Sequence, residues 1–360
     1  MTTITRWVAT AVGAPLERVT EPAPRPDPGK VLVEVAGCGV CHTDIGFWAD
    51  GVPTRAPMPL ALGHEVAGFV VDVGEGAEEL LGKAVVVPAV LPCGRCAACA
   101  AGQGGVCRAQ FMPGNDGHGG FATHVLVPAL GLCEVPGAET ADQPLGKAGV
   151  TLRHLSVLAD AASTAWQGVL RTELADGGAA VVVGSGGVGS FVLQLARARG
   201  AKVVALDTNE QRRATALELG ADVVIDASQP VRDVRKAVKA ALRELGAPSF
   251  GVRVYECSGN PAGQELAFQL LGAAGVLAVI GYSAERVSLH LSRLMALDAR
   301  AIGTWGCDPK HYPGLLQMVL DGVVAVRPLV EEHPLERIND LLEAIRRHEV
   351  NRRVILVPST

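Results

Sequence analysis

A strand, a glycine turn and a helix follow one another between residues 179 and 199, and no other feature of the sequence restricts the fold as much. The apolar run AAVVV is followed by GSGGVG and then by an amphipathic segment. In that context a G-x-G-x-x-G turn is typical of a site for the phosphates of a dinucleotide, because the helix N-terminus faces the negative charge. The predicted contact residues are Gly184, Gly186, Gly187, Val188 and Gly189. Taken alone, the glycines are also compatible with a turn that binds nothing.

Three glycines of this turn have separate predicted roles. Gly184 permits the tight turn, Gly186 lets the backbone approach a pyrophosphate, and Gly189 lets the helix and the strand pack closely. Asp207 ends the next predicted strand. A carboxylate there can accept hydrogen bonds from the ribose hydroxyls of adenosine, which favours NAD over NADP. Arg212 is a further candidate for a cationic contact, and a solvated helix position explains it equally well.

Predicted strands and helices alternate through the second half of the chain. The predicted strands span residues 179–183, 202–206, 222–225, 252–256 and 276–280. The predicted helices span residues 188–199, 210–219, 231–245 and 261–271. This alternation predicts an α/β fold with a doubly wound parallel sheet, the Rossmann architecture, over residues 162–304.

The first half of the chain has a different pattern. Short apolar segments at 31–35, 66–73, 84–88 and 123–128 are separated by Gly and Pro, which predicts a compact antiparallel β-barrel over residues 1–161. At 360 residues the chain exceeds the ~250–300 residues at which a single core stops growing, so two domains are expected. Residues 305–360, with two helical stretches and a strand at 353–357, are too few to fold alone and are predicted to complete the first domain.

The composition excludes several classes of partner. The formal net charge is −5, and Lys and Arg are scattered, so neither nucleic acid nor an anionic membrane is expected as a partner. The sequence starts without a signal peptide and contains no run near the ~20 apolar residues that cross a bilayer, which predicts a cytoplasmic location. A small-molecule partner is therefore expected.

Four of the nine cysteines lie within fifteen residues, at 93–107. Cys93, Cys96, Cys99 and Cys107 place four soft ligands in one loop, which is what a closed tetrahedral zinc site needs. An iron–sulfur cluster also takes four thiolates, and a chance grouping of thiols is the structural alternative. A structural zinc ion is the prediction.

A second, dispersed set of candidate ligands consists of Cys41, His64, Glu65 and Asp160. Each residue alone is weak evidence, since a lone Cys or His is more often packing and Asp160 alone predicts a helix N-cap. The segments GCGVCHTD and GHEVAG, the four-cysteine lobe and GSGGVG occur in this order. Together they resemble the zinc-containing medium-chain dehydrogenase/reductase family over essentially the whole chain. The resemblance implies a GroES-like β-barrel catalytic domain and a Rossmann coenzyme domain.

The resemblance also implies roles for single residues around a catalytic zinc. Cys41 and His64 match zinc ligands, Asp160 takes the place of the usual third cysteine, and Glu65 matches a close or exchangeable ligand. Asp44 matches the carboxylate that orients His64. Hence the resemblance implies two zinc ions per chain, one catalytic and one structural.

Further matches concern the proton and the coenzyme. Thr43 matches the hydroxyl that takes the alcohol proton, and His42 and Arg353 match contacts to the pyrophosphate. Thr164 is predicted as a further coenzyme contact. Gly46 stands where the family usually has a relay histidine. The proton is therefore expected to leave through a ribose hydroxyl, water or another base.

The family resemblance implies an NAD-dependent zinc alcohol dehydrogenase, expected as a homodimer or homotetramer. YECSGNPAGQ, LSRLMALDARAIGTWGC and KHYP more specifically resemble the subgroup that oxidises the ring hydroxyl of 6-hydroxycyclohex-1-ene-1-carbonyl-CoA in anaerobic benzoyl-CoA degradation. Another secondary alcohol, 1,4-hydride delivery to a cyclic enone, and a non-enzymatic NAD-binding protein are the alternatives. The last conflicts with retention of Cys41, Thr43, His64 and Asp160, because a binding module needs no open metal position.

Overall fold

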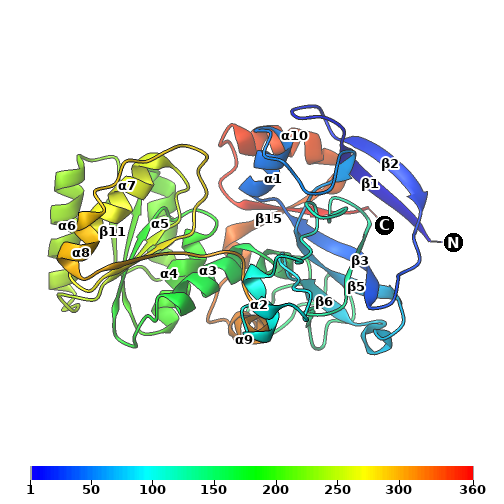
Figure 1. Ribbon diagram of the computed structural model, residues 1–360, viewed down its shortest axis with the longest axis horizontal. Helices are drawn as coiled ribbons and strands as arrows, with labels where there is room; N and C mark the ends of the chain where they lie inside the picture. Colours follow the sequence, from blue (N-terminus) through cyan, green and yellow to red (C-terminus); the bar gives the residue numbers. More distant parts are fainter. Residues whose placement is uncertain (1, 360) are drawn as a thin grey trace. The chain divides into compact units, whose positions relative to one another are not determined.

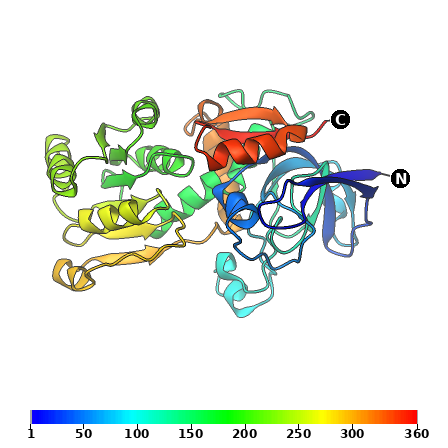
Figure 2. The same ribbon diagram turned by 90° about the horizontal axis from the view of Figure 1, so that it is seen from above.

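The computed structural model describes residues 2–359, and the chain divides into two compact units. The first unit comprises Met1–Ser163, Gly306–Gly322 and Val326–Thr360, and the second comprises Thr164–Trp305 and Val323–Ala325. Figures 1 and 2 show the elements of both units, coloured along the sequence. Apart from Val323–Ala325, the C-terminal segments therefore belong to the same unit as the N-terminal half.

The second unit is built on a six-stranded sheet in which every neighbouring pair is parallel. The strand order is β11-β10-β9-β12-β13-β14. The strands are β9 (Ala179–Val183), β10 (Lys202–Asp207), β11 (Val223–Asp226), β12 (Arg253–Glu256), β13 (Val276–Val279) and β14 (Arg300–Gly303). The order reverses between β9 and β12, which is the position where doubly wound sheets bind ligands.

Helices cover both faces of this sheet. They are α3 (Ala161–Arg171), α4 (Gly189–Ala198), α5 (Glu210–Glu218), α6 (Val231–Glu244), α7 (Pro261–Leu270) and α8 (Ser292–Leu297), of which α3 begins in the first unit. Val181 and Val183 of β9 share a core cluster with residues of α6 and α7. Ala180 and Val182 are also buried, and alternation places them on the opposite face. Burial on both faces explains the continuous apolar run of β9.

Side chains at the helix starts explain where α5 and α7 begin. The Asn209 side chain accepts a hydrogen bond from the Arg212 backbone N–H, and the Asn260 side chain does the same for Gly263. Pro261 stands in the first turn of α7, where a missing N–H costs nothing. These caps fix the loops at the carboxyl ends of β10 and β12.

The first unit contains two sheets. One is three-stranded in the order β2-β1-β4, and the other runs β15-β16-β3-β5-β6-β8 with β7 paired to β3. The strands are β1 (Thr3–Ala9), β2 (Glu17–Pro22), β3 (Lys30–Gly39), β4 (Leu60–Ala61), β5 (Glu65–Val73), β6 (Ala84–Val87), β7 (His124–Pro128), β8 (Cys133–Glu134), β15 (Val330–Pro334) and β16 (Arg353–Val357). The antiparallel pairing of β16 with β3 brings the chain's last strand beside one of its first.

Short helices complete the first unit. They are α1 (His42–Trp48), α2 (Ala97–Ala100), α9 (Tyr312–Leu320) and α10 (Ile338–Arg346), and several 3-10 helices that include His154–Leu158 and Pro309–His311. Leu341 and Leu342 of α10 join the core formed by β3, β5 and β6. Of the helices in residues 2–359, none combines the length and apolar character that crossing a membrane requires.

Candidate metal centres and coenzyme site

The four-cysteine lobe forms one compact cluster of thiols. The Sγ atoms of Cys93, Cys96, Cys99 and Cys107 all lie within 4.8 Å of one another. Cys96 Sγ is 3.5 Å from Cys99 Sγ and 3.6 Å from Cys107 Sγ. Backbone N–H donation from Arg95 is the main cause that lowers the pKa of Cys93 to about 6. The donor set suits a closed tetrahedral zinc site. The lowered pKa of Cys93 favours the thiolate form of that ligand, whereas burial raises the pKa of Cys99 to about 11.

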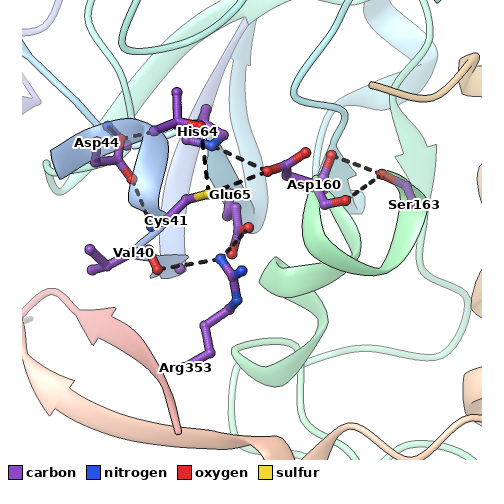
Figure 3. Close-up of polar contacts among 12 residues, drawn as sticks. Val40, Cys41, Asp44, His64, Glu65, Asp160, Ser163 and Arg353 are labelled. Atoms are coloured by element: carbon purple, nitrogen blue, oxygen red, sulfur yellow. Dashed lines mark hydrogen bonds and ion pairs between the residues drawn. The ribbon is translucent and has the colours of Figure 1, made fainter. Parts of the chain in front are cut away.

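The second cluster gathers residues from three separate segments of the first unit. One ligand atom each of Cys41, His64, Glu65 and Asp160 lies within 4.8 Å of the others. Asp160 Oδ2 is 3.4 Å from His64 Nε2 and 3.6 Å from Cys41 Sγ (Figure 3). Cys41 precedes α1, His64 directly precedes β5, and Glu65 begins that strand. Asp160 lies between the 3-10 helix His154–Leu158 and α3. The structure thus brings together the dispersed residues that the sequence grouped.

Asp44 holds two sides of this cluster in place. Its Oδ2 accepts a hydrogen bond from the Cys41 backbone N–H at 2.9 Å, and its Oδ1 lies 3.2 Å from His64 Nδ1. The Gly63 N–H also donates to Oδ1. Burial alone disfavours a charged imidazole, but the charge of Asp44 and hydrogen bonds to Asp160 and Asp44 raise the pKa of His64 above its ordinary value. The surroundings of His64 Nε2 therefore favour a positive charge.

Glu65 forms a buried ion pair on the other side of the cluster. Arg353 Nη1 lies 2.7 Å from Glu65 Oε1 and also donates to the Val40 carbonyl. Burial raises the pKa of Glu65 to about 7, although the charge of Arg353 opposes that rise. A Cβ at Gly39 would overlap Glu65 Oε2, so a larger residue at this position would push the carboxylate out of its present position.

The polar contacts of two buried atoms in this cluster show whether the residues suit a bound cation. Among residues 2–359, Glu65 Oε2 has no hydrogen-bond partner, and His64 Nε2 forms a 3.4 Å ion pair with Asp160 Oδ2. A buried carboxylate oxygen without a partner costs free energy unless another group binds it. A thiol, an imidazole and carboxylates form a donor set that zinc accepts. The residues present therefore fit a zinc ion.

The glycine turn occupies the loop between β9 and α4 in the second unit. Gly184 adopts a φ of 88°, which favours glycine, and a Cβ at Gly189 would collide with the Gly184 carbonyl oxygen. Asp207 Oδ2 accepts hydrogen bonds from the Ser185 N–H at 2.8 Å and hydroxyl at 3.2 Å. A Cβ at Gly186 would lie 3.7 Å from Arg212 Nη1. Asp207 and Arg212 thus both lie beside the turn.

Comparison with known proteins identifies the family. The family model described as "Alcohol dehydrogenase GroES-like domain" matches residues 27–137, and the one described as "Zinc-binding dehydrogenase" matches residues 187–321. L-threonine 3-dehydrogenase from Pyrococcus furiosus is 32% identical over 304 residues, covering 82% of this chain and 80% of the relative. The chain belongs to the zinc-containing medium-chain dehydrogenase/reductase family. It is an NAD(P)-dependent zinc alcohol dehydrogenase.

Other relatives of this dehydrogenase cover nearly its whole length. An alcohol dehydrogenase from Geobacillus stearothermophilus is 29% identical over 339 residues, with 92% of this chain and 93% of the relative covered. The solved alcohol dehydrogenase from Aeropyrum pernix superposes with a TM-score of 0.84 at 29% identity, covering 98% of this chain and all of that chain. The predicted α/β class, with a GroES-like domain and a parallel-sheet Rossmann domain, is confirmed.

The remaining predicted site residues of the dehydrogenase lie as follows. Cys41 Sγ is 3.7 Å from Thr43 Oγ1, so this hydroxyl borders the metal cluster. The exposed His42 ring stacks on His348 with the ring centroids 6.1 Å apart. Arg353 is buried against Glu65, and its contact with a pyrophosphate stays a prediction. Thr164 lies on α3, as the first residue of the second unit.

Sequence reasoning missed two polar residues near these sites. Glu256 ends β12 beside the strand-order reversal, is fully buried, and accepts hydrogen bonds from the Ser258 backbone and hydroxyl. An acidic residue at the carboxyl end of a central parallel strand was the available signal. Tyr312 bonds to the segment that carries Asp160. No spacing connects residues 153 positions apart, so no local signal indicated it.

Proposed function

We propose that this dehydrogenase holds its catalytic zinc on Cys41, His64 and Asp160, with Glu65 as a close or exchangeable ligand. The observation that carries the proposal is the convergence of four ligand atoms within 4.8 Å, in a cluster that includes a buried Glu65 Oε2 without a hydrogen-bond partner among residues 2–359. When bound, zinc supplies a Lewis acid for the substrate oxygen. A carboxylate in place of a thiolate makes this ligand set harder.

The protein's own residues position and move the proton. Asp44 fixes the ring of His64 through Nδ1, which leaves Nε2 directed at the cluster. The Thr43 hydroxyl borders Cys41 and is the proposed first acceptor of the alcohol proton. Gly46 offers no side chain to continue that relay. The proton then passes to a ribose hydroxyl, to water or to another base.

Zinc is also proposed for the four-cysteine lobe, with a structural purpose. Four sulfur ligands leave no position for a substrate, whereas the cluster around Cys41, His64 and Asp160 offers three ligands and an exchangeable fourth, Glu65. Two zinc ions per chain with unequal roles follow. Metal analysis of the purified protein tests the count, and iron in the lobe would contradict the proposal.

NAD is the proposed coenzyme, bound at the glycine turn. Asp207 ends β10 beside Gly184–Gly189, where its carboxylate would accept bonds from ribose hydroxyls and repel a 2′-phosphate. The nicotinamide supplies the hydride acceptor for oxidation of a secondary alcohol to a ketone.

The proposed substrate is 6-hydroxycyclohex-1-ene-1-carbonyl-CoA, which oxidation converts to the 6-oxo product. The sequence resemblance in the segments YECSGNPAGQ, LSRLMALDARAIGTWGC and KHYP supports it. A turnover screen of hydroxyacyl-CoA thioesters against their free acids and simple cyclic alcohols tests it. Equal turnover of the free acids would reduce the proposal to a general secondary-alcohol dehydrogenase.

Two further expectations complete the proposal. Deuterated coenzyme and product analysis separate oxidation at the carbinol carbon from 1,4-hydride delivery to a cyclic enone. From the family resemblance we expect a homodimer or homotetramer in the cytoplasm, and sedimentation of the purified enzyme measures the oligomeric state.

A further inference from the structure

Asp160 lies at a junction where the backbone changes its helical form. The 3-10 helix His154–Leu158 ends two residues before it, and α3 (Ala161–Arg171) begins directly after it. Such a junction does not by itself fix the direction of the intervening side chain, because 3-10 and α geometry differ in rise and twist. The peptide groups on either side of Asp160 must therefore be held by other contacts.

The Tyr312 hydroxyl provides such a contact. It donates a hydrogen bond to the Ala159 carbonyl at 2.6 Å, immediately before Asp160. Ser163 Oγ lies 3.0 Å from this hydroxyl and 3.1 Å from the Asp160 carbonyl oxygen. Figure 3 shows Ser163 beside Asp160. Tyr312 and Ser163 are both 1% exposed, so water does not compete for these bonds.

The segment that carries Tyr312 is anchored to the four-cysteine lobe. Asp308 accepts a hydrogen bond from the Gly104 N–H at 3.3 Å, and Lys310 Nζ donates to the Gly102 carbonyl at 2.8 Å. Pro309 stands in the first turn of the 3-10 helix Pro309–His311, which leads directly into α9 and Tyr312. The hydroxyl of Tyr312 therefore reaches Ala159 from a fixed base.

We propose that Tyr312 is a positioning residue that aims the Asp160 carboxylate at Cys41 and His64. This inference rests on the proposed function, since it takes Asp160 as a zinc ligand. Metal ligands must be placed within about 0.2 Å of ideal distances, so a small rotation of the Asp160 peptide weakens the site. Loss of a group that supports a ligand typically lowers metal affinity about 10 to 100-fold.

The protein contains a matched control for removing this hydroxyl. Tyr255 is 0% exposed, and its hydroxyl lies 2.7 Å from Thr172 Oγ1 in the second unit. Tyr255→Phe and Tyr312→Phe delete the same atom from similarly buried, hydrogen-bonded surroundings. A purely structural role for Tyr312 predicts equal behaviour of the two variants.

The experiment is a chelator titration of the zinc-loaded wild-type enzyme and of Tyr312→Phe, Tyr255→Phe and Asp160→Asn. We expect Tyr312→Phe to lose one of its zinc ions at about 10-fold lower free chelator than the wild type, while Tyr255→Phe matches the wild type. The emptied site is then reloaded with Co²⁺, whose visible spectrum reports ligand geometry. We expect an altered spectrum in Tyr312→Phe and the wild-type spectrum in Tyr255→Phe. Melting temperatures of both Tyr variants control for general destabilisation.

The outcomes separate this inference from the proposed function. If Asp160→Asn keeps wild-type zinc affinity, the ligand assignment is wrong. If Asp160→Asn loses zinc and Tyr312→Phe retains the wild-type affinity and cobalt spectrum, the assignment stands and the positioning role is overturned. Should Tyr312→Phe fail to fold, Ser163→Ala removes the neighbouring hydroxyl and is expected to lower zinc affinity in the same direction; wild-type affinity in that variant would equally overturn the inference.

Discussion

Arg353 and Glu65 form an ion pair in the first unit, with 2.7 Å between Nη1 and Oε1 and side-chain exposures of 9% and 0%. Glu65 opens β5 and Arg353 opens β16, and β3 lies between these strands in the sheet. The pair neutralises a carboxylate that is part of the candidate zinc cluster. Replacing either residue alone by a neutral one therefore leaves the charge of the other buried without its partner.

Arg353→Met should destabilise the protein strongly. Removal of one member of a buried ion pair costs roughly 3–5 kcal/mol, because the other charge is left uncompensated. Urea unfolding measures this loss. Arg352→Met changes the exposed neighbouring arginine and should stay within about 0.5 kcal/mol of the wild type. Adding Glu65→Gln to Arg353→Met should recover part of the stability; no recovery would show that the charge is not the cause.

Cys96→Ser should remove one zinc ion and lower the melting temperature. The four sulfur atoms lie within 4.8 Å, so loss of one ligand opens a site whose metal stabilises the lobe. Metal analysis and thermal melting measure the two effects. Cys133→Ser replaces a buried thiol outside both clusters and should retain two zinc ions per chain. A Cys96→Ser variant with full zinc content would refute a four-cysteine site.

Asp160→Asn distinguishes a zinc ligand from a helix cap. If Asp160 is a ligand, removal of its charge should lower zinc occupancy or turnover by about 10 to 100-fold or more while the fold survives. A capping role predicts a nearly silent change, because Asn caps helices about as well as Asp. Zinc content and kcat are the measurements. A fully active variant would make Glu65 the first candidate for the third ligand.

Asp207→Ala should narrow the preference for NAD over NADP. Loss of the carboxylate removes both the ribose acceptor and the repulsion of a 2′-phosphate. We expect the ratio of kcat/KM for NAD to kcat/KM for NADP to fall on the order of 10-fold, which corresponds to about 1.4 kcal/mol. Glu210→Ala removes an exposed carboxylate three residues away and should leave the ratio unchanged. A wild-type enzyme that prefers NADP would contradict the assignment without any variant.

The sequence predicted the parallel sheet of the second unit well. The predicted strand at 179–183 coincides with β9, and the predicted helix at 210–219 differs from α5 (Glu210–Glu218) by one residue. These segments are recognisable because strands buried on both faces are continuously apolar. By contrast, β2 (Glu17–Pro22) is exposed along its whole length, and β14 (Arg300–Gly303) is largely exposed. Such strands carry no apolar pattern, and their partners in the sheet determine them.

The candidate site was predictable only in part, because some of its contacts join segments that lie far apart in the sequence. Cys41, His64 and Asp160 were assigned through the family resemblance of their motifs, because each residue alone is weak evidence for a ligand. The Arg353–Glu65 pair joins positions 288 residues apart, and no local spacing indicates such a contact. The contact between Tyr312 and Ala159 also joins distant positions, so no local spacing indicates it either. Residues that support a site from a distant segment become visible only when the fold is known.

The return of the C-terminal segments to the first unit determines the order in which the parts of the chain are completed during synthesis. Residues Thr164–Trp305, nearly all of the second unit, leave the ribosome before β16 has been made, whereas the first unit still lacks the strand that pairs with β3. The second unit can therefore fold first, since domains fold as units once their sequence is available. Until β16 arrives, Gly39 and Cys38 of β3 present an unpaired strand edge, which is a site for association with other chains. A nascent chain stalled before residue 353 should consequently bind chaperones through its N-terminal half.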